Sequence, residues 1–147
     1  MKKHTIQIIM CIVGVLLLCG CDISSNDNGK LDGTWHLIST ETLSTGDIAD
    51  HSQQRLYWNI QSRLLQLEDK DYVHSSCLLR FEQKGMQLRV FEPYRYNREE
   101  GDEPLSDAVL LLPFGISQTD ETFLIEQINS KYLIMKSEEV RLSFRKQ

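Results

Sequence analysis

Cys77-Leu78-Leu79-Arg80-Phe81-Glu82-Gln83-Lys84-Gly85-Met86-Gln87-Leu88-Arg89-Val90 is the stretch that decides the fold class. Apolar side chains occupy every second position on both sides of the Lys84-Gly85 pair. Such alternation is typical of β-strands that bury one face. Gly85 can adopt a positive φ, which suits a tight turn between two strands. The stretch therefore predicts a β-hairpin.

The same period of two recurs along most of the chain after residue 30. We expect strands over 33–42, 55–61, 63–68, 75–83, 86–92, 122–129, 131–136 and 139–146. Short strands separated by turns at intervals of roughly 8–12 residues are typical of antiparallel barrels and sandwiches. Residues 107–112 have no clear period, and they fit either a buried strand or a short helix ended by Pro113.

The N-terminal segment has the composition of a secretory signal. Lys2 and Lys3 precede an apolar run from Ile6 to Leu18, which is shorter than the roughly 20 residues that a bilayer crossing needs. The following residues, Leu18-Cys19-Gly20-Cys21, resemble the lipobox of bacterial lipoproteins. This resemblance implies that residues 1–20 are removed as a signal peptide and that Cys21 carries a lipid. An uncleaved N-terminal anchor is the alternative.

Both alternatives tether the protein to the cell envelope, where we expect an outer-membrane location. Residues 21–30 are polar and rich in turn-forming types, so we expect a flexible tether between Cys21 and the folded part. The predicted barrel domain covers residues 31–147. Cys77 is the one cysteine left after the signal segment and the lipidated position, so this domain has no intramolecular disulfide.

The charge balance bears on which partners the protein can bind. The whole chain has a formal net charge of −5, from 16 Lys and Arg against 21 Asp and Glu. Removal of Lys2 and Lys3 with the signal peptide makes the charge −7, since all the acidic residues remain. A net charge of this sign argues against nucleic acid as a partner and against charge-driven binding to anionic lipid.

No constellation typical of catalysis or metal binding is present in the sequence. His74 and Cys77 have a spacing that two metal ligands use, but a metal site needs three or four. The acidic run Glu99–Glu103 lacks the spacing of a calcium loop, so we interpret it as a solvated loop. We therefore predict no metal, no cofactor and no enzymatic activity.

Both ends of the predicted domain resemble the lipocalins. Gly33-Thr34-Trp35 resembles the opening of their first strand, and residues 140–147 are similar to the last strand of small lipocalin-like lipoproteins of Bacteroidetes. The resemblance implies an all-β fold, a small antiparallel up-and-down barrel of about eight strands. It also implies a basic residue over Trp35, for which Arg145 is our first choice and Arg141 the second. Such a pair would close the barrel through a cation–π contact.

This fold leaves two functions open. An eight-stranded barrel can hold one small ligand or be filled by its own side chains. For non-catalytic binding of a small apolar or amphipathic ligand, we expect the interior to be lined by Trp58, Ile60, Leu79, Phe81, Leu88, Val90 and Phe144. The alternative is an adaptor lipoprotein that binds another envelope protein, with Tyr94, Arg95 and Tyr96 in the long loop 93–106 as the expected contact surface.

Overall fold

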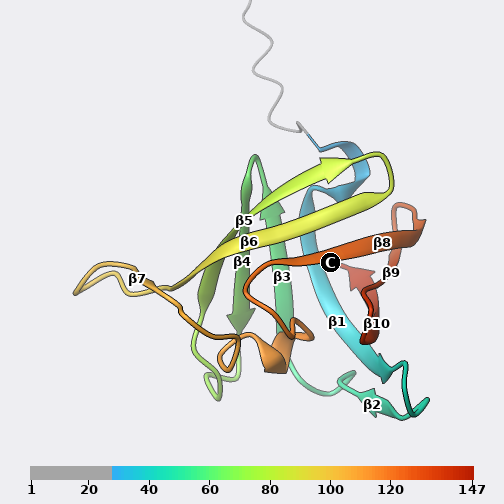
Figure 1. The fold of residues 1–147 in the computed structure, drawn as a ribbon, viewed down its shortest axis with the longest axis horizontal. Coiled ribbons are helices and arrows are strands. Elements are labelled where there is room, and N and C mark those ends of the chain that lie inside the picture. Colours follow the sequence, from blue (N-terminus) through green and yellow to red (C-terminus); the bar gives the residue numbers. More distant parts are fainter. Residues whose placement is uncertain (1–27) are drawn as a thin grey trace, which may run out of the picture.

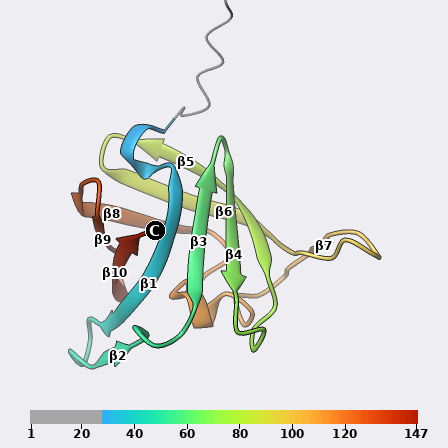
Figure 2. The ribbon, with the colours of Figure 1, turned by 180° about the vertical axis from the view of Figure 1, so that it is seen from behind.

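Consecutive antiparallel strands close into a barrel in the computed structural model, which describes residues 28–147 (Figures 1 and 2). The predicted signal peptide (1–20), Cys21 and the first part of the predicted tether lie outside the described residues. The eight barrel strands are β1 (Gly33–Thr42), β3 (Leu56–Gln61), β4 (Leu64–Asp69), β5 (Cys77–Lys84), β6 (Gln87–Arg95), β8 (Glu121–Ile128), β9 (Tyr132–Lys136) and β10 (Val140–Lys146).

The fold class predicted from the alternating pattern is confirmed. Each of the eight strands pairs antiparallel with its neighbour in sequence, and β10 pairs with β1 to close the barrel. Two very short strands, β2 (Ile48–Asp50) and β7 (Glu103–Pro104), pair outside this circuit with β1 and β6. Among residues 28–147, no helix is long and apolar enough to cross a membrane.

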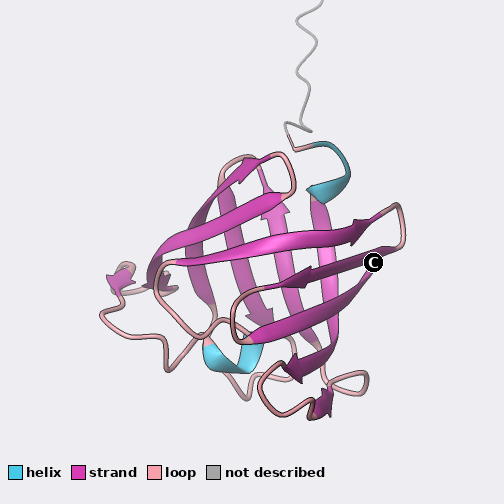
Figure 3. Cartoon of the chain, turned by 45° about the vertical axis from the view of Figure 1, so that its right-hand side comes forward, coloured by secondary structure: helices cyan, strands magenta, loops and turns pink. Residues whose placement is uncertain are grey.

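Two 3-10 helices lie at opposite ends of the barrel (Figure 3). Helix η2 (Gly29–Leu31) precedes β1, and η3 (Leu112–Phe114) lies in the long connection between β6 and β8. The predicted tether over 21–30 overlaps η2, because Asn28 and the helix already belong to the folded domain. Residues 107–112, left open between strand and helix, form bends and a turn that lead into η3, and Pro113 lies inside this helix.

The up-and-down order sorts the connections into two sets, one at each end of the barrel (Figure 1). The η2 end carries the start of β1, the β3–β4, β5–β6 and β8–β9 turns, and the end of β10. The η3 end carries the remaining connections, over 43–55, 70–76, 96–120 and 137–139.

One hydrophobic core fills the space inside the strands. Every fully buried apolar side chain lies between Leu31 and Phe144, including Trp35 and Trp58, which are opposite each other on β1 and β3. The alternation of the strands explains this core, since each strand turns its apolar positions inward. Within the described residues, the core therefore extends from Leu31 to Phe144.

Candidate functional site

The residues predicted to line a ligand cavity instead form the packed core of the barrel. Trp58 lies at its centre, with its ring edge-on to Phe123 at 5.8 Å and to Phe144 at 5.1 Å between centroids. The other predicted lining residues are at most 6% exposed: Ile60, Leu79, Phe81, Leu88, Val90 and Phe144. In the described structure the interior is filled by side chains, which is one of the two cases that the sequence left open.

A plug segment, residues 105–117, covers the η3 end of the barrel. Its side chains Leu111, Phe114 and Ile116 are completely buried and belong to the core. Helix η3 lies across this end of the strands (Figure 3). The helix ends at Phe114 and is capped by Gly115, whose φ of +82° favours glycine, and a Cβ there would lie 2.4 Å from Leu142 Cδ2.

Polar contacts hold the plug segment to the barrel wall. The indole Nε1 of Trp58 donates a hydrogen bond of 3.0 Å to the Phe114 carbonyl oxygen. The carboxylate of Glu121, buried at the start of β8, accepts from the backbone N–H groups of Ser117 and Gln118 and from the Ser117 hydroxyl. These contacts satisfy polar groups that burial would otherwise leave unpaired.

The η2 end is closed around Trp35, as predicted, but by a different cation. Lys146 Nζ lies 4.9 Å from the centroid of the Trp35 ring and donates to the Lys30 carbonyl oxygen at 3.1 Å. Trp35 Nε1 donates to the Leu31 carbonyl oxygen at 2.8 Å. Gly33 has a φ of +127°, and a Cβ there would lie 2.8 Å from Lys146 Cε. The Gly-x-Trp pattern thus makes room for the lysine stem above the indole.

The prediction that Arg145 covers Trp35 is wrong, and so is the second choice, Arg141. Side chains alternate along a strand, and Phe144 points into the barrel. Arg145 therefore points outward, and Lys146 lies on the same side as Phe144. Arg141 also lies outside, where it pairs with Glu41 at 2.8 Å and Glu126 at 3.2 Å. Its guanidinium lowers the pKa of the Glu126 carboxyl.

The predicted partner surface, Tyr94, Arg95 and Tyr96, lies partly in strand β6 and partly in the connection that follows it. Tyr94 and Arg95 end β6 and pair with Pro104 and Glu103 of β7. Arg95 is exposed, whereas Tyr94 and Tyr96 are half-buried. The Tyr96 ring and hydroxyl contact the guanidinium of Arg98. Tyr94 and Arg95 thus lie in the β6–β7 pair and Tyr96 directly follows β6, and the role of the three residues in binding stays a prediction.

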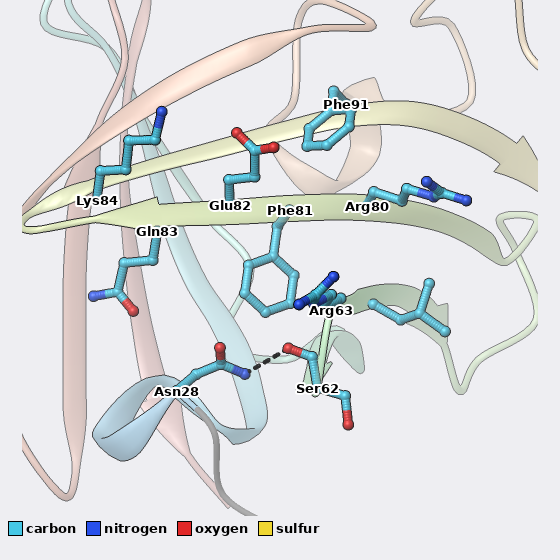
Figure 4. Close-up of a pocket in the computed structure, with 10 residues that line it drawn as sticks. Asn28, Ser62, Arg63, Arg80, Phe81, Glu82, Gln83, Lys84 and Phe91 are labelled. Carbon is cyan, nitrogen blue, oxygen red and sulfur yellow. Dashed lines mark hydrogen bonds between the residues drawn. The ribbon is translucent and has the colours of Figure 1, made fainter.

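A pocket of about 810 Å³ lies beside the β3–β4 turn, at the η2 end (Figure 4). Basic side chains dominate its charge: Arg63, Arg80 and Lys84 line it together with Glu82. Asn28 Nδ2 donates to the Ser62 carbonyl oxygen at 2.9 Å, and Phe81 projects from β5 toward this turn. Sequence reasoning missed the pocket, because its residues come from four separate segments that only the barrel brings together.

The described residues contain no group of three or more His, Cys, Asp or Glu side chains arranged to hold a metal ion. Burial raises the pKa of the Cys77 thiol to about 11, so this thiol stays protonated at neutral pH. A reactive cysteine needs the opposite shift. Cys77 thus acts as a small core residue.

Comparison with known proteins identifies the family. A family model described as a lipocalin-like domain matches residues 16–147. The chain belongs to the lipocalin-like domain family. The lipocalin-like barrel is similar to the crystal structure of a lipocalin-like protein from Bacteroides uniformis, with a TM-score of 0.61 and 19% identity over 81% of this chain and 100% of that chain.

A second solved structure, an uncharacterized protein from Bacteroides eggerthii, has a TM-score of 0.52 and 15% identity to the lipocalin-like chain. The match covers 79% of this chain and 98% of that chain. Comparison with curated proteins gives no match. At these identities the two structures support the fold, and the family indicates a binding-type barrel.

Proposed function

We propose that this protein is a lipid-anchored, non-catalytic adaptor of the bacterial cell envelope, which binds another envelope protein through the outer surface of its barrel. The observation that carries the proposal is the filled barrel. Trp58 occupies the centre, and Leu111, Phe114 and Ile116 occupy the end where a ligand would enter. Within residues 28–147, buried side chains occupy the interior positions where a ligand would bind, which supports recognition at the surface.

The contact surface that we propose is the η3 end. Five large apolar side chains are exposed at this end, and four of them lie on two neighbouring loops: Tyr72, Val73, Val109 and Leu112. The two loops that carry them meet, because the His74 ring lies edge-on to Phe114 at 6.4 Å. Exposed apolar groups that lie together are typical of protein–protein contact sites.

The charge around this surface suggests the chemistry of the partner. The connections at the η3 end are strongly acidic, with Asp71 beside Tyr72 and Asp107 beside the plug helix. The Asp71 carboxylate already pairs with Arg55 at 2.7 Å, whereas Glu99, Glu100 and Asp107 form no ion pair within residues 28–147. A partner with an apolar patch and a basic rim fits this surface.

The anchor has its own test. By the lipobox resemblance, Cys21→Ala is expected to abolish labelling of the protein with a radioactive or clickable fatty acid and to release it from the membrane fraction. Unchanged labelling of this variant would refute lipidation at Cys21 while leaving the adaptor surface open.

The adaptor surface is tested by capture from envelope extracts of the native host. In the variant Tyr72→Ser/Leu112→Ser, capture of the partner is expected to weaken at least thirtyfold, because a hot-spot side chain contributes about 2 kcal/mol. The matched control is Tyr132→Ser/Leu124→Ser, which removes the same residue types from the barrel wall, where both are exposed. Equal capture by both variants would exclude the η3 end.

Alanine substitution of Tyr94, Arg95 and Tyr96 tests the surface predicted from sequence in the same assay. If these substitutions abolish capture without changing the melting temperature, the contact surface is at the β6–β7 loop.

Binding of a small apolar ligand is the second candidate. It requires the plug segment to leave, and three apolar side chains in the plug already occupy the place of such a ligand. Native mass spectrometry of residues 22–147 purified from the host distinguishes the candidates. A co-purified small molecule that is lost on denaturation would favour the ligand, and a clean protein mass would favour the adaptor.

A further inference from the structure

The two ends of the barrel carry opposite charge. The segments at the η2 end contribute the cations Lys30, Arg63, Lys84, Lys131, Arg145 and Lys146. The acidic groups there are Asp32, which Asn28 binds through its N–H and its side-chain amide, and Glu82, which lines the pocket and pairs with Arg89 at 3.7 Å. The connections at the η3 end carry the acids Asp47, Asp50, Asp71, Glu99, Glu100, Asp102, Glu103, Asp107, Asp120, Glu138 and Glu139, against Arg55, Lys70 and Arg98.

The basic side chains at the η2 end lie close together in space. Arg63 and Lys84 line one pocket with Asn28 (Figure 4). Lys146 binds the carbonyl oxygen of Lys30, and its backbone N–H donates to the carbonyl oxygen of Lys131. Within residues 28–147, neither Arg63 nor Lys84 forms an ion pair, so both charges are available. We call the surface formed by Lys30, Arg63, Lys84, Lys131 and Lys146 the basic end.

The described chain begins at this same end. Asn28 touches the β3–β4 turn, and the residue proposed to carry the lipid, Cys21, is seven positions earlier. An extended chain spans roughly 3.3–3.6 Å per residue, so Asn28 lies within about 25 Å of the lipidated position. A tether this short keeps the barrel at a high effective concentration at the membrane surface.

We infer that the basic end docks onto an anionic lipid surface and orients the barrel upright, with the acidic η3 end pointing away from the membrane. The inference rests on the lipid anchor of the proposed function and adds an orientation to it. Lipid phosphates attract the basic end, and the same charge repels the η3 end, so both ends favour one orientation. The negative net charge would argue against such binding if the charged residues were spread evenly over the surface. In this barrel the acidic residues are concentrated at the η3 end and basic residues at the η2 end.

The β5–β6 hairpin tip supplies an apolar contact for the same surface. Met86 lies at this tip, 47% exposed, between Gly85 and Gln87 and two positions after Lys84. Segments that bind membrane interfaces combine apolar side chains, which enter the headgroup region, with neighbouring basic side chains, which are attracted to anionic lipids. The hairpin tip and the β3–β4 turn lie at the same end of the barrel as η2, where the described residues begin (Figure 1).

The test uses residues 22–147, which lack the anchor and retain the whole core, with vesicles of phosphatidylcholine alone or mixed with phosphatidylglycerol. We expect sedimentation with the mixed vesicles at low salt, its loss at high salt, and no sedimentation with phosphatidylcholine. The variant Arg63→Glu/Lys84→Glu is expected to lose at least about 25-fold in partition coefficient, since each basic residue contributes about fivefold.

The matched control is Arg98→Glu/Lys70→Glu, which makes the same change of net charge at the η3 end. It is expected to bind the mixed vesicles as the parent does. Equal loss in both variants would overturn the basic end in favour of a general effect of net charge, and absence of binding by the parent protein would overturn docking itself. Neither outcome bears on fatty-acid labelling at Cys21, so failure of the docking and failure of the anchor are distinguishable.

A second measurement reports the orientation directly. A polarity-sensitive dye is attached at Met86→Cys or at Ile48→Cys, which is 69% exposed at the η3 end. Labelling is selective in residues 22–147, because Cys21 is absent and Cys77 is buried. We expect a blue shift on mixed vesicles for the Met86 position alone, and a shift at Ile48 alone would overturn the orientation.

Discussion

Phe114→Ala tests whether the plug segment is part of the packed core. The Phe114 side chain is fully buried, and removal of a buried Phe side chain costs about 3–5 kcal/mol, part of it from the cavity left behind. We expect the lower end of this range, about 3 kcal/mol, because the plug is a loop that can partly collapse. The hydrogen bond from Trp58 is retained, since its acceptor is the backbone carbonyl.

Urea unfolding of residues 22–147, followed by tryptophan fluorescence, measures this change. Both tryptophans are buried, so unfolding changes their environment. With an m-value of about 1.5–2 kcal/mol/M, the midpoint is expected to fall by about 1.5–2 M with an unchanged slope. Leu112→Ala is the control in the same helix, where the side chain is 56% exposed and the effect should stay within about 0.5 kcal/mol.

The same variant offers an apolar cavity to a small molecule. Enclosed apolar cavities left by large-to-small substitutions stay dry and can bind small apolar molecules, so Phe114→Ala should bind a small aromatic probe that the parent protein excludes. A cost under about 1 kcal/mol, together with probe binding by the parent, would refute the packed plug and restore the ligand-binding barrel.

Three further predictions concern the two ends and the core. Gly115→Ala should destabilise the domain by more than about 1 kcal/mol in the same urea assay, because φ is positive and a Cβ would clash with Leu142. Lys146→Met should cost about 1 kcal/mol through loss of the cation–π contact, and Arg145→Met less than half of that; the reverse order would contradict the assignment of Lys146. Stability should fall as pH rises from about 9 to 11, because the unfolded thiol of Cys77 ionises before the folded one, and Cys77→Ala should flatten this slope.

Alternation along the chain was sufficient to predict all eight barrel strands, since period two directly reflects which side chains face the interior. Applied one residue further, the same rule would have placed Lys146 over Trp35. Phe144 is apolar and points inward. Because side chains of a strand alternate, the next inward side chain is that of Lys146, two positions later, and not that of Arg145. The expectation of Arg145 rested on the resemblance, which implies a basic residue over Trp35, and on the favourable pairing of a guanidinium with an indole.

The plug and the basic end were beyond sequence reasoning for different physical reasons. Leu110-Leu111-Leu112-Pro113-Phe114 is apolar without a period, so neither strand nor helix is indicated, and its place at one end depends on the closed barrel. The cations of the basic end are scattered over the whole chain. They come together only because alternate turns of an up-and-down barrel share one end.

The pairing of β10 with β1 bears on the lipid-anchored arrangement that we propose. Lipid-anchored molecules are concentrated in two dimensions, where an exposed sheet edge would recruit neighbouring copies into growing assemblies. Closure removes the two long edges, and the edges of β2 and β7 extend over only three and two residues. In the anchored arrangement that we propose, the closed barrel therefore gives neighbouring copies no long strand edge on which to pair.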